Sequence, residues 1–223
     1  MSTLQEMWPF LRTGFGMTIV LLVLSMILST LLGTVLAGMR VSPVWPFRMF
    51  GTGYVNIFRN TPLVVLFILI VEGFPAIDVR PSFDSVGLGI FESLAVIALS
   101  IYTAAFVCEV VRAGVNTVDA GQAEAARSVG MTFGQTLRIV VLPQAFRNVI
   151  PPMASVYIAL AKNTSVAAAF GIVEATAELS RMNERTIAST MKLFVVIAIG
   201  YIIIVWVIAL VAAILEKGVS RAR

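Results

Sequence analysis

Long apolar stretches alternate with short polar segments along the chain of 223 residues. A helix of about 20 mainly apolar residues crosses the hydrocarbon core of a bilayer. By this measure three stretches are clear, at residues 14–38, 88–111 and 193–215. The two glutamates of the middle stretch lie toward its ends, where a charged side chain can reach the interface. These three stretches predict transmembrane helices.

Two further stretches are less regular. The apolar run LVVLFILIV is short, so the second span is predicted to extend over residues 59–77, with Thr61 as the N-cap and Pro62 as the first helical residue. The fourth span, residues 149–173, is long enough but carries Lys162 near its middle. With these two stretches, the pattern predicts about five transmembrane helices.

Composition agrees with an all-α integral membrane protein. Hydrophobic residues make up 59% of the chain and charged residues only 13%, which excludes an ordinary soluble domain. The predicted organisation is an external N-terminal segment at residues 1–13, a transmembrane domain at residues 14–216 and a cytoplasmic tail at residues 217–223.

Charge and residue usage narrow the function further. The net charge is +4, but the basic residues flank apolar runs, where membrane topology explains them, so nucleic acid is not an expected partner. The single cysteine, Cys108, lies inside an apolar run, and the chain has no histidine. An internal disulfide is therefore excluded, and neither a metal site nor a histidine-based catalytic site is expected.

The distribution of basic residues predicts the orientation, because cytoplasmic loops carry an excess of lysine and arginine. With five spans and a cytoplasmic C-terminus, the inner segments hold ten basic residues and the outer segments five. The inner residues are Arg40, Arg48, Arg59, Arg112, Arg127, Arg138, Arg147, Lys217, Arg221 and Arg223. The N-terminus is then outside, and the polar segment between the third and fourth spans is cytoplasmic.

Acidic residues are expected in two settings. Near the inner end of the third span, Glu109 and Arg112 are three residues apart and are expected to form a local ion pair. The predicted outer loops hold Asp78, Asp84, Glu174, Glu178 and Glu184. These five side chains are expected either to be solvated or to meet basic residues of an external binding protein.

The polar segment at residues 119–143 has the pattern of two short helices joined by a bend. Asp119 is placed as an N-cap of the first helix and Gly130 is placed to end it. Thr132 and Gln135 have the spacing of a capping box, which predicts the start of the second helix. A bent pair of helices is therefore expected on the cytoplasmic side of the membrane.

This polar segment also has a surface suited to docking. Ala125 and Ala126 leave part of the first helix with little side-chain bulk, so another backbone can approach closely, and Glu124 and Arg127 flank them. Pro143 is expected to stop or kink the second helix before the fourth span. The alternative is an amphipathic helix that lies on the bilayer surface.

The residues of this segment follow a recognisable order. Glu124-Ala125-Ala126, three residues, Gly130, nine residues, Val140, one residue and Leu142-Pro143 resemble the EAA motif of the membrane subunits of bacterial ABC importers. The family usually has isoleucine at the position of Val140, and this difference preserves an apolar contact. The resemblance assigns ATPase coupling to Glu124, Ala125, Ala126, Arg127, Gly130, Leu142 and Pro143.

Other segments extend the resemblance over nearly the whole chain. RNTPL at residues 59–63, VLPQAFRNVIPP at residues 141–152 and KNTS at residues 162–165 are similar to the polar amino acid branch of the family. MRVSP at residues 39–43 and GQAEAARS at residues 121–128 resemble its glutamate-type permeases. The resemblance therefore implies the type I permease fold and uptake of glutamate or a related amino acid.

The resemblance also implies the partners and the mechanism. In such importers a pair of membrane subunits forms the pathway, two ATPase subunits bind the cytoplasmic face, and an external binding protein delivers the substrate. The second permease subunit is expected to form a heterodimer with this chain rather than a homodimer, in the bacterial cytoplasmic (inner) membrane. The chain has no GxxxxGK[ST] motif, so ATP and Mg²⁺ are expected on the ATPase, and this chain is expected to be no enzyme and to hold no cofactor.

Lys162 is the candidate for the substrate pathway. A charged side chain in the middle of a membrane is costly, on the order of 3 kcal/mol on insertion scales, and usually faces a cavity or a partner. Asn163, Thr164 and Ser165 follow it and add hydrogen-bonding groups. We expect Lys162 to set the potential of the translocation cavity and to contact a substrate carboxylate. The alternative is that it pairs with a buried acid such as Glu109, or reaches an interface.

Arg59, Asn60 and Thr61 have two equal interpretations. They form either a cytoplasmic gate or ATPase contact, or a helix cap beside an arginine placed by the positive-inside rule. The competing function for the whole chain is a secondary amino acid carrier or a channel that ATP does not power. Such proteins need no cytoplasmic docking segment, and secondary carriers often have repeated halves, which this sequence lacks.

Overall fold

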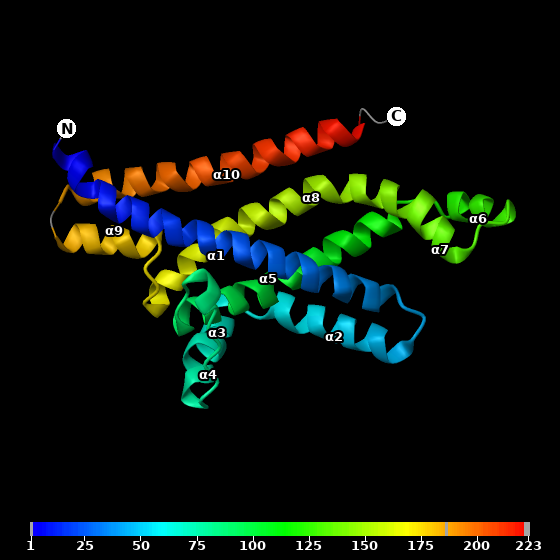
Figure 1. The fold of residues 1–223 in the computed structure, drawn as a ribbon, viewed down its shortest axis with the longest axis horizontal. Helices are drawn as coiled ribbons and strands as arrows, with labels where there is room; N and C mark the ends of the chain where they lie inside the picture. The colour runs from blue at the N-terminus through cyan, green and yellow to red at the C-terminus, as the bar shows by residue number, and fades with distance from the viewer. Residues whose placement is uncertain (1, 186, 221–223) are drawn as a thin grey trace.

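The structure, a computed structural model, describes residues 2–185 and 187–220, and this part of the chain is a long helical bundle (Figure 1). Three helices are long and apolar enough to cross a membrane: α1 (Ser2–Val41), α5 (Ile90–Asn116) and α10 (Thr190–Ser220). Two bent pairs of helices raise the number of candidate spans to five. The predicted all-α membrane architecture is therefore confirmed.

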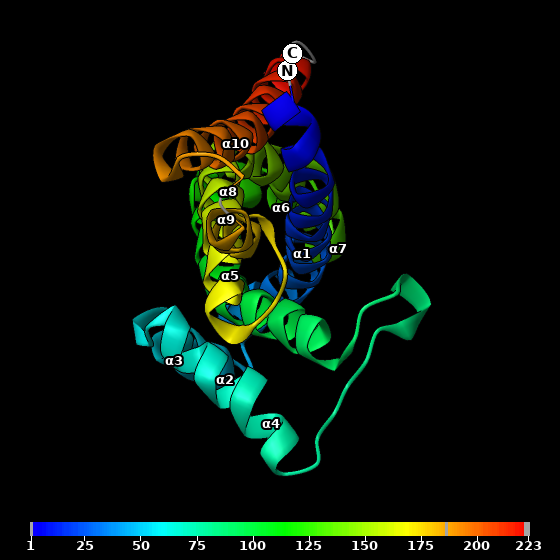
Figure 2. The same ribbon diagram turned by 90° about the vertical axis from the view of Figure 1, so that its left-hand side faces the viewer.

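The predicted second span, residues 59–77, falls within the first bent pair. α2 (Trp45–Asn60) meets the stretch Leu63–Ala76, which begins with α3 (Leu63–Phe67), at an angle of 109°. The chain then continues through a π-helical turn, η1 (Ile68–Glu72), and α4 (Gly73–Ala76). α3 and α4 stand out from the bundle, and a long loop leads from α4 to the short 3₁₀ helix η2 (Asp84–Val86), as Figure 2 shows.

The predicted role of Thr61 as the N-cap of the second span is wrong. Thr61 is the C-cap of α2, and its hydroxyl donates a hydrogen bond of 2.8 Å back to the carbonyl of Ile57. Pro62 is the residue that precedes α3 and makes no side-chain cap. The cause is the proline ring, which keeps the preceding residue out of the helical region, so α2 has to end before Pro62.

The fourth predicted span corresponds to the second bent pair. α8 (Leu142–Asn163) passes directly into a 3₁₀ helix, η4 (Thr164–Phe170), which ends at Gly171 with a φ of 78°. After that turn the chain bends by 47° into α9 (Ala175–Glu184). Lys162 therefore lies at the junction of an α-helix with a tighter helix rather than in the middle of a straight span.

Both chain ends are more helical than expected. Residues 2–13 of the predicted external segment are part of α1, which begins at Ser2 and accommodates Pro9, and residue 1 lies outside the described residues. The predicted tail at residues 217–223 starts inside α10, which continues to Ser220, and residues 221–223 lie outside the described residues. Helices of this length extend beyond the hydrocarbon core, so the predicted boundaries of the spans within them stay predictions.

The bundle is packed around α1 and α5, and small residues let the backbones approach closely. A Cβ atom at Gly33 of α1 would lie 2.6 Å from Val107 of α5. A Cβ atom at Gly114 of α5 would lie 2.2 Å from Val149 of α8. The largest fully buried apolar side chains are Phe67, Leu21, Leu36, Leu94, Leu99, Leu160, Ile172, Met182 and Leu193.

The two ends of the bundle differ. α6 (Ala120–Ser128) and α7 (Phe133–Gln135) lie at the same end as the C-terminus of α10 (Figure 1). The N-terminus, α9 and the start of α10 lie at the opposite end. The polar segment and the C-terminus are therefore on one side of the bundle, which agrees with the predicted relative topology.

Candidate coupling and translocation site

The first helix of the polar segment has well-defined ends. Asp119 is the N-cap of α6, and its carboxylate accepts a hydrogen bond of 2.7 Å from the backbone N–H of Gly121. Such a cap satisfies a backbone donor that the helix itself leaves free. The predicted N-cap is confirmed.

The C-terminal end of α6 is a Schellman motif built on Gly130. The φ of Gly130 is 90°, a region that favours glycine. Its N–H donates to the carbonyl of Arg127 at 3.0 Å, and the N–H of Met131 donates to the carbonyl of Ala126 at 3.1 Å. These two bonds satisfy carbonyls at the end of the helix and reverse the chain direction. The predicted role of Gly130 in ending the helix is confirmed.

The second helix begins with the predicted capping box. The backbone N–H of Thr132 donates to Gln135 Oε1 at 2.9 Å, and the N–H of Gln135 donates to Thr132 Oγ1 at 3.3 Å. The chain continues from α7 through a π-helical segment, η3 (Thr136–Val141), into α8 without a break. Pro143 lies directly after η3, where α8 begins, so it does not stop the helix as expected. The kink at Pro143 stays a prediction.

Side-chain hydrogen bonds join the polar segment to the helices that flank it. Gln144 Nε2 donates to Gln122 Oε1 at 2.5 Å, which joins α8 to α6. Asn148 Nδ2 donates to Thr117 Oγ1 at 2.7 Å, which joins α8 to the residue after α5. Ala126 is buried, with 8% of its surface exposed. We define residues 119–143 as the hairpin. The hydrogen bond of Gln144 with Gln122 and the burial of Ala126 hold α6 in a fixed position against α8.

The outer surface of the hairpin carries most of the residues assigned to coupling. Glu124, Ala125 and Arg127 are exposed, and Val129 is 81% exposed beside them. Leu142, at the start of α8, is also exposed, with 46% of its surface accessible. Ala126 is turned inward, so of the two alanines in the motif only Ala125 is available for close approach by another protein.

A cavity of about 390 Å³ lies between α5 and α8. It is lined by Tyr102, Thr103, Phe106, Ser155, Val156, Ala159, Leu160 and Asn163. The hydroxyl and amide groups among these residues give the cavity hydrogen-bonding capacity. Asn163 is the member of the predicted pathway set that the structure brings to this cavity.

The other three residues of the KNTS segment point elsewhere. Lys162 is exposed on the surface of the chain. Thr164 is fully buried and donates to the carbonyl of Ala161 at 2.8 Å, while Ser165 donates to the carbonyl of Lys162 at 2.7 Å. Successive residues of a helix face different directions, so this segment contacts the cavity, the surface and the interior at once.

The expected ion pair of Glu109 with Arg112 is wrong. Glu109 instead forms an ion pair with Arg40 of α1, whose side chain is only 9% exposed, and its other oxygen lies 3.9 Å from Arg59 of α2. Glu109 is thereby engaged by α1 and α2, which also disfavours the alternative that it pairs with Lys162. The sequence did not predict the pairing of Glu109 with Arg40, because the two residues are 69 positions apart.

The RNT segment caps a helix in this structure. Asn60 Nδ2 donates to the carbonyl of Asn56 at 2.8 Å, and Thr61 donates likewise to the preceding turn of α2. Arg59 lies in the last turn of α2, at the opposite end of that helix from the loop that joins α1 to α2. The role of Arg59 as a gate stays a prediction.

Two of the five acidic residues expected in outer loops are buried. Glu174 is 0% exposed and Glu178 is 3% exposed. Glu174 is the N-cap of α9 and accepts hydrogen bonds from the backbone N–H groups of Thr176 and Ala177 at 2.7 and 2.9 Å. The expectation of solvated loop charges is therefore wrong for this pair, because the chain folds back into the bundle as α9.

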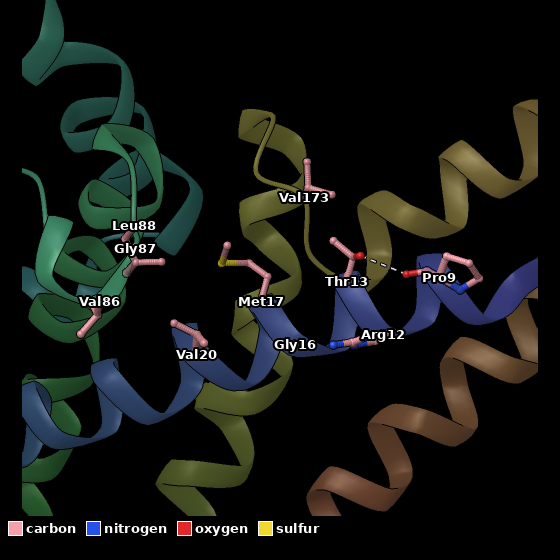
Figure 3. A pocket seen from close by; sticks show the side chains of 10 residues that line it. All are labelled: Pro9, Arg12, Thr13, Gly16, Met17, Val20, Val86, Gly87, Leu88 and Val173. Atoms are coloured by element: carbon pink, nitrogen blue, oxygen red, sulfur yellow. Dashed lines mark hydrogen bonds between the residues drawn. The ribbon is translucent and has the colours of Figure 1, made fainter.

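A second cavity, of about 610 Å³, lies near the N-terminal part of α1 (Figure 3). Arg12 and Val20 of α1 line one side, and Gly87 and Leu88, which follow η2, lie opposite. Val173 extends over it from the segment before α9. This cavity is at the end of the bundle opposite the hairpin and contains one cationic side chain.

Comparison with known proteins agrees with the geometry. Residues 29–222 match the family described as binding-protein-dependent transport system inner membrane component. The chain is 40% identical over 210 residues to the glutamate transport system permease protein GluC of Corynebacterium efficiens, covering 92% of each chain. It is 36% identical over 217 residues to the L-cystine transport system permease protein TcyB of Bacillus subtilis (strain 168), covering 97% of this chain and 89% of the relative.

A solved structure extends the comparison to three dimensions. The crystal structure of an amino acid ABC transporter with histidines has a chain that matches this one with a TM-score of 0.83 and 28% identity, over 96% of each chain. The resemblance drawn from the EAA-like motif is thereby confirmed. This chain belongs to the family of binding-protein-dependent transport system inner membrane components, the permease subunits of ABC importers.

Proposed function

We propose that this permease subunit imports a polar amino acid, with glutamate favoured, and that the hairpin transmits the action of a separate ATPase. The observation that carries the proposal is the rigidly capped hairpin, whose exposed Glu124, Ala125 and Arg127 stand at one end of the bundle. The glutamate assignment is supported by the MRVSP and GQAEAARS segments and by the similarity to GluC.

The hairpin acts as the coupling element in this proposal. Two ATPase subunits, which hold ATP and Mg²⁺, bind from the cytoplasm and accept the α6 surface in a cleft. Closure of the ATPases moves the hairpin, and α8 transmits the movement as a rigid body. The N-terminus is outside and the C-terminus is cytoplasmic, in the bacterial inner membrane, because the inner segments of the five-span topology hold ten basic residues and the outer segments five.

Cysteine cross-linking tests the coupling role. The chain has one cysteine, Cys108, which is buried, so a Cys108→Ala background supports single-cysteine variants. Ala125→Cys is expected to form a disulfide with cysteines placed along the cleft of the ATPase. Trp206→Cys, which is 65% exposed on α10, is the matched control and is expected to form none. Equal trapping at the two positions would contradict the coupling role.

The substrate pathway lies between this chain and a second permease subunit, with a heterodimer favoured. Asn163 and the cavity between α5 and α8 form part of its wall, and an external binding protein delivers the amino acid. Lys162 is exposed where a partner subunit can enclose it, and its charge attracts the substrate carboxylate. Thr164 and Ser165 stabilise the same segment through their hydrogen bonds to the carbonyls of Ala161 and Lys162.

A charge substitution tests the pathway role. Lys162→Met is expected to lower amino acid uptake in reconstituted complexes at least tenfold, because it removes the cation while keeping similar side-chain length. Lys192→Met, at the exposed start of α10, is the control and is expected to leave uptake unchanged. Normal uptake by an assembled Lys162→Met complex would refute this role.

Reconstitution with the ATPase and the binding protein tests the function as a whole. Uptake of labelled glutamate is expected to need ATP and to be inhibited more by acidic amino acids than by amide or basic ones. Uptake by the permease alone, without ATP, would instead indicate a secondary carrier. Equal inhibition by all three classes would overturn the glutamate assignment and leave the importer assignment standing.

A further inference from the structure

The cavity near the N-terminal part of α1 continues into a second one on the same side of this helix. The second cavity has a volume of about 220 Å³ and is lined by Leu24, Ile27, Leu28, Phe83, Ser85 and Val86. Val86 of η2 lines both cavities, so the two adjoin there. They form one groove between α1 and residues 83–88, which we call the α1–η2 groove.

The α1 wall of the groove contains a single row of residues. Arg12, Gly16, Val20, Leu24 and Leu28 follow one another at intervals of four, which places them on one face of a helix. With a rise of about 1.5 Å per residue, the row from Arg12 to Leu28 is about 24 Å long. One leaflet of a bilayer, headgroups included, is about 20–22 Å thick, which is half of the whole membrane. The groove therefore has the length of a single phospholipid layer.

The cation of this row is at one end, and the rest of the row is glycine and apolar side chains. Within residues 2–185 and 187–220, the guanidinium of Arg12 has neither an ion-pair partner nor a hydrogen-bond partner. The hydroxyl of the neighbouring Thr13 donates to the carbonyl of Pro9 at 3.0 Å, so it is already bonded (Figure 3). Asp84 of η2 is outside both linings and accepts a hydrogen bond from Ser82. The groove therefore presents an unpaired cation at the end of an apolar channel.

The length of α1 places Arg12 at the level of the lipid headgroups. No charged residue lies between Arg12 and Arg40, and the helix rises by about 42 Å from one to the other. A bilayer with its headgroups is about 40–45 Å thick, so each arginine reaches the headgroups of one leaflet. Trp8, one turn before Arg12, is 65% exposed and fits the same depth, because tryptophan is enriched at membrane interfaces.

We propose that the α1–η2 groove binds one anionic phospholipid of the leaflet that surrounds the N-terminal end of α1. Its phosphate accepts hydrogen bonds from the guanidinium of Arg12, whose planar donors match phosphate oxygens, and one acyl chain lies along Val20, Leu24 and Leu28. A soluble anion would leave the apolar part of the groove empty, and an uncharged chain would leave Arg12 unpaired. The assignment to the outer leaflet rests on the proposed orientation, whereas the site does not depend on the amino acid carried.

The test is the protection of a thiol in the groove, measured in the delipidated importer complex in detergent. Val20→Cys in the Cys108→Ala background reports occupancy through its rate of labelling by N-ethylmaleimide. Palmitoyl-oleoyl phosphatidylglycerol is expected to lower this rate at least tenfold. Phosphatidylcholine with the same acyl chains has no net charge, and it is expected to need at least a tenfold higher concentration for equal protection.

A charge substitution tests the recognition of the phosphate. Arg12→Gln is expected to raise the concentration of phosphatidylglycerol needed for protection at least tenfold. Arg80→Gln is the matched control, because it removes an exposed cation that pairs with Asp78 and does not line the groove. This control is expected to change the concentration less than twofold.

A filling substitution tests the shape of the groove. A Cβ atom at Gly16 would meet no atom within 4 Å, so the leucine of Gly16→Leu can enter the groove without displacing the protein. The ratio of labelling rates with and without phosphatidylglycerol is expected to approach one in this variant. Gly38→Leu is the matched control, since Gly38 is an equally open position of the same helix outside the groove, and it is expected to keep full protection.

The outcomes distinguish a phospholipid from other occupants. Equal protection by the two lipids, equal protection by inorganic phosphate or glutamate, or undiminished protection of Arg12→Gln would overturn the proposal. Slow labelling of the lipid-free complex with fast labelling of the isolated subunit would show that the second permease subunit covers the groove, and would also overturn it. Failure of amino acid uptake by the wild-type complex would overturn the proposed function alone.

Discussion

Gly130→Ala tests whether the bend of the hairpin is needed for coupling. The φ of Gly130 is 90°, and a Cβ atom there would meet no atom within 4 Å, so the cost of alanine comes from the backbone conformation alone. A left-handed conformation costs a non-glycine residue roughly 1–2 kcal/mol. This penalty lowers the equilibrium constant for the bent hairpin roughly 5- to 30-fold. We expect the affinity of the permease for its ATPase to fall by up to the same factor, because only the bent fraction binds.

The assay is equilibrium binding of the purified ATPase to the permease in detergent, with Gly134→Ala as the control. Gly134 lies in α7, its φ is negative, and a Cβ atom there would also meet nothing within 4 Å. Alanine favours a helix over glycine, so this control is expected to bind normally. Gly130→Asn is expected to give an intermediate affinity, since asparagine tolerates the left-handed region better. Identical affinities for Gly130→Ala and Gly134→Ala would refute the reasoning.

Three other substitutions test the packing and the charges. Gly114→Ala places a Cβ atom 2.2 Å from Val149 and is expected to destabilise the α5–α8 contact by about 1–3 kcal/mol. The measurement is the melting temperature in detergent, which is expected to fall. An unchanged melting temperature would contradict this packing. Glu109→Gln leaves the guanidinium of Arg40, which is only 9% exposed, without its carboxylate partner. It is expected to lower the melting temperature more than Arg40→Gln does, because Glu109 is more exposed and also faces Arg59. Asp119→Ala removes the cap of α6 and is expected to cost about 1 kcal/mol, seen as faster hydrogen exchange in α6 only.

The sequence predicted those features that depend on local chemistry. The three long apolar helices follow from hydrocarbon thickness, and the ends of α6 follow from the preferences of Asp119 and Gly130. The capping box of Thr132 and Gln135 likewise needs only residues three positions apart. Helix ends and turns depend on residues that are neighbours in the sequence, which is why the sequence alone predicted them.

The features that the sequence did not predict depend on distant residues. Glu174 bonds Thr18, 156 positions away, and Glu109 pairs with Arg40, 69 positions away. A buried acid and a solvated acid look alike in a single sequence until the partner is known. The mistaken N-cap has a different origin, since a threonine before Pro62 fits the end of one helix as well as the start of the next.

The unbroken helix from Phe133 to Phe170 has a mechanical consequence. It begins with a wide π-helical turn at the cytoplasmic hairpin and ends with a tight 3₁₀ turn at the KNTS segment. Each residue of an α-helix advances by about 100° around the helix axis, so a change of winding at one end rotates the side chains at the other. A push on the hairpin can therefore reach the pathway as a rotation of one continuous helix, and Pro151 and Pro152 inside α8 are the positions where that helix can bend.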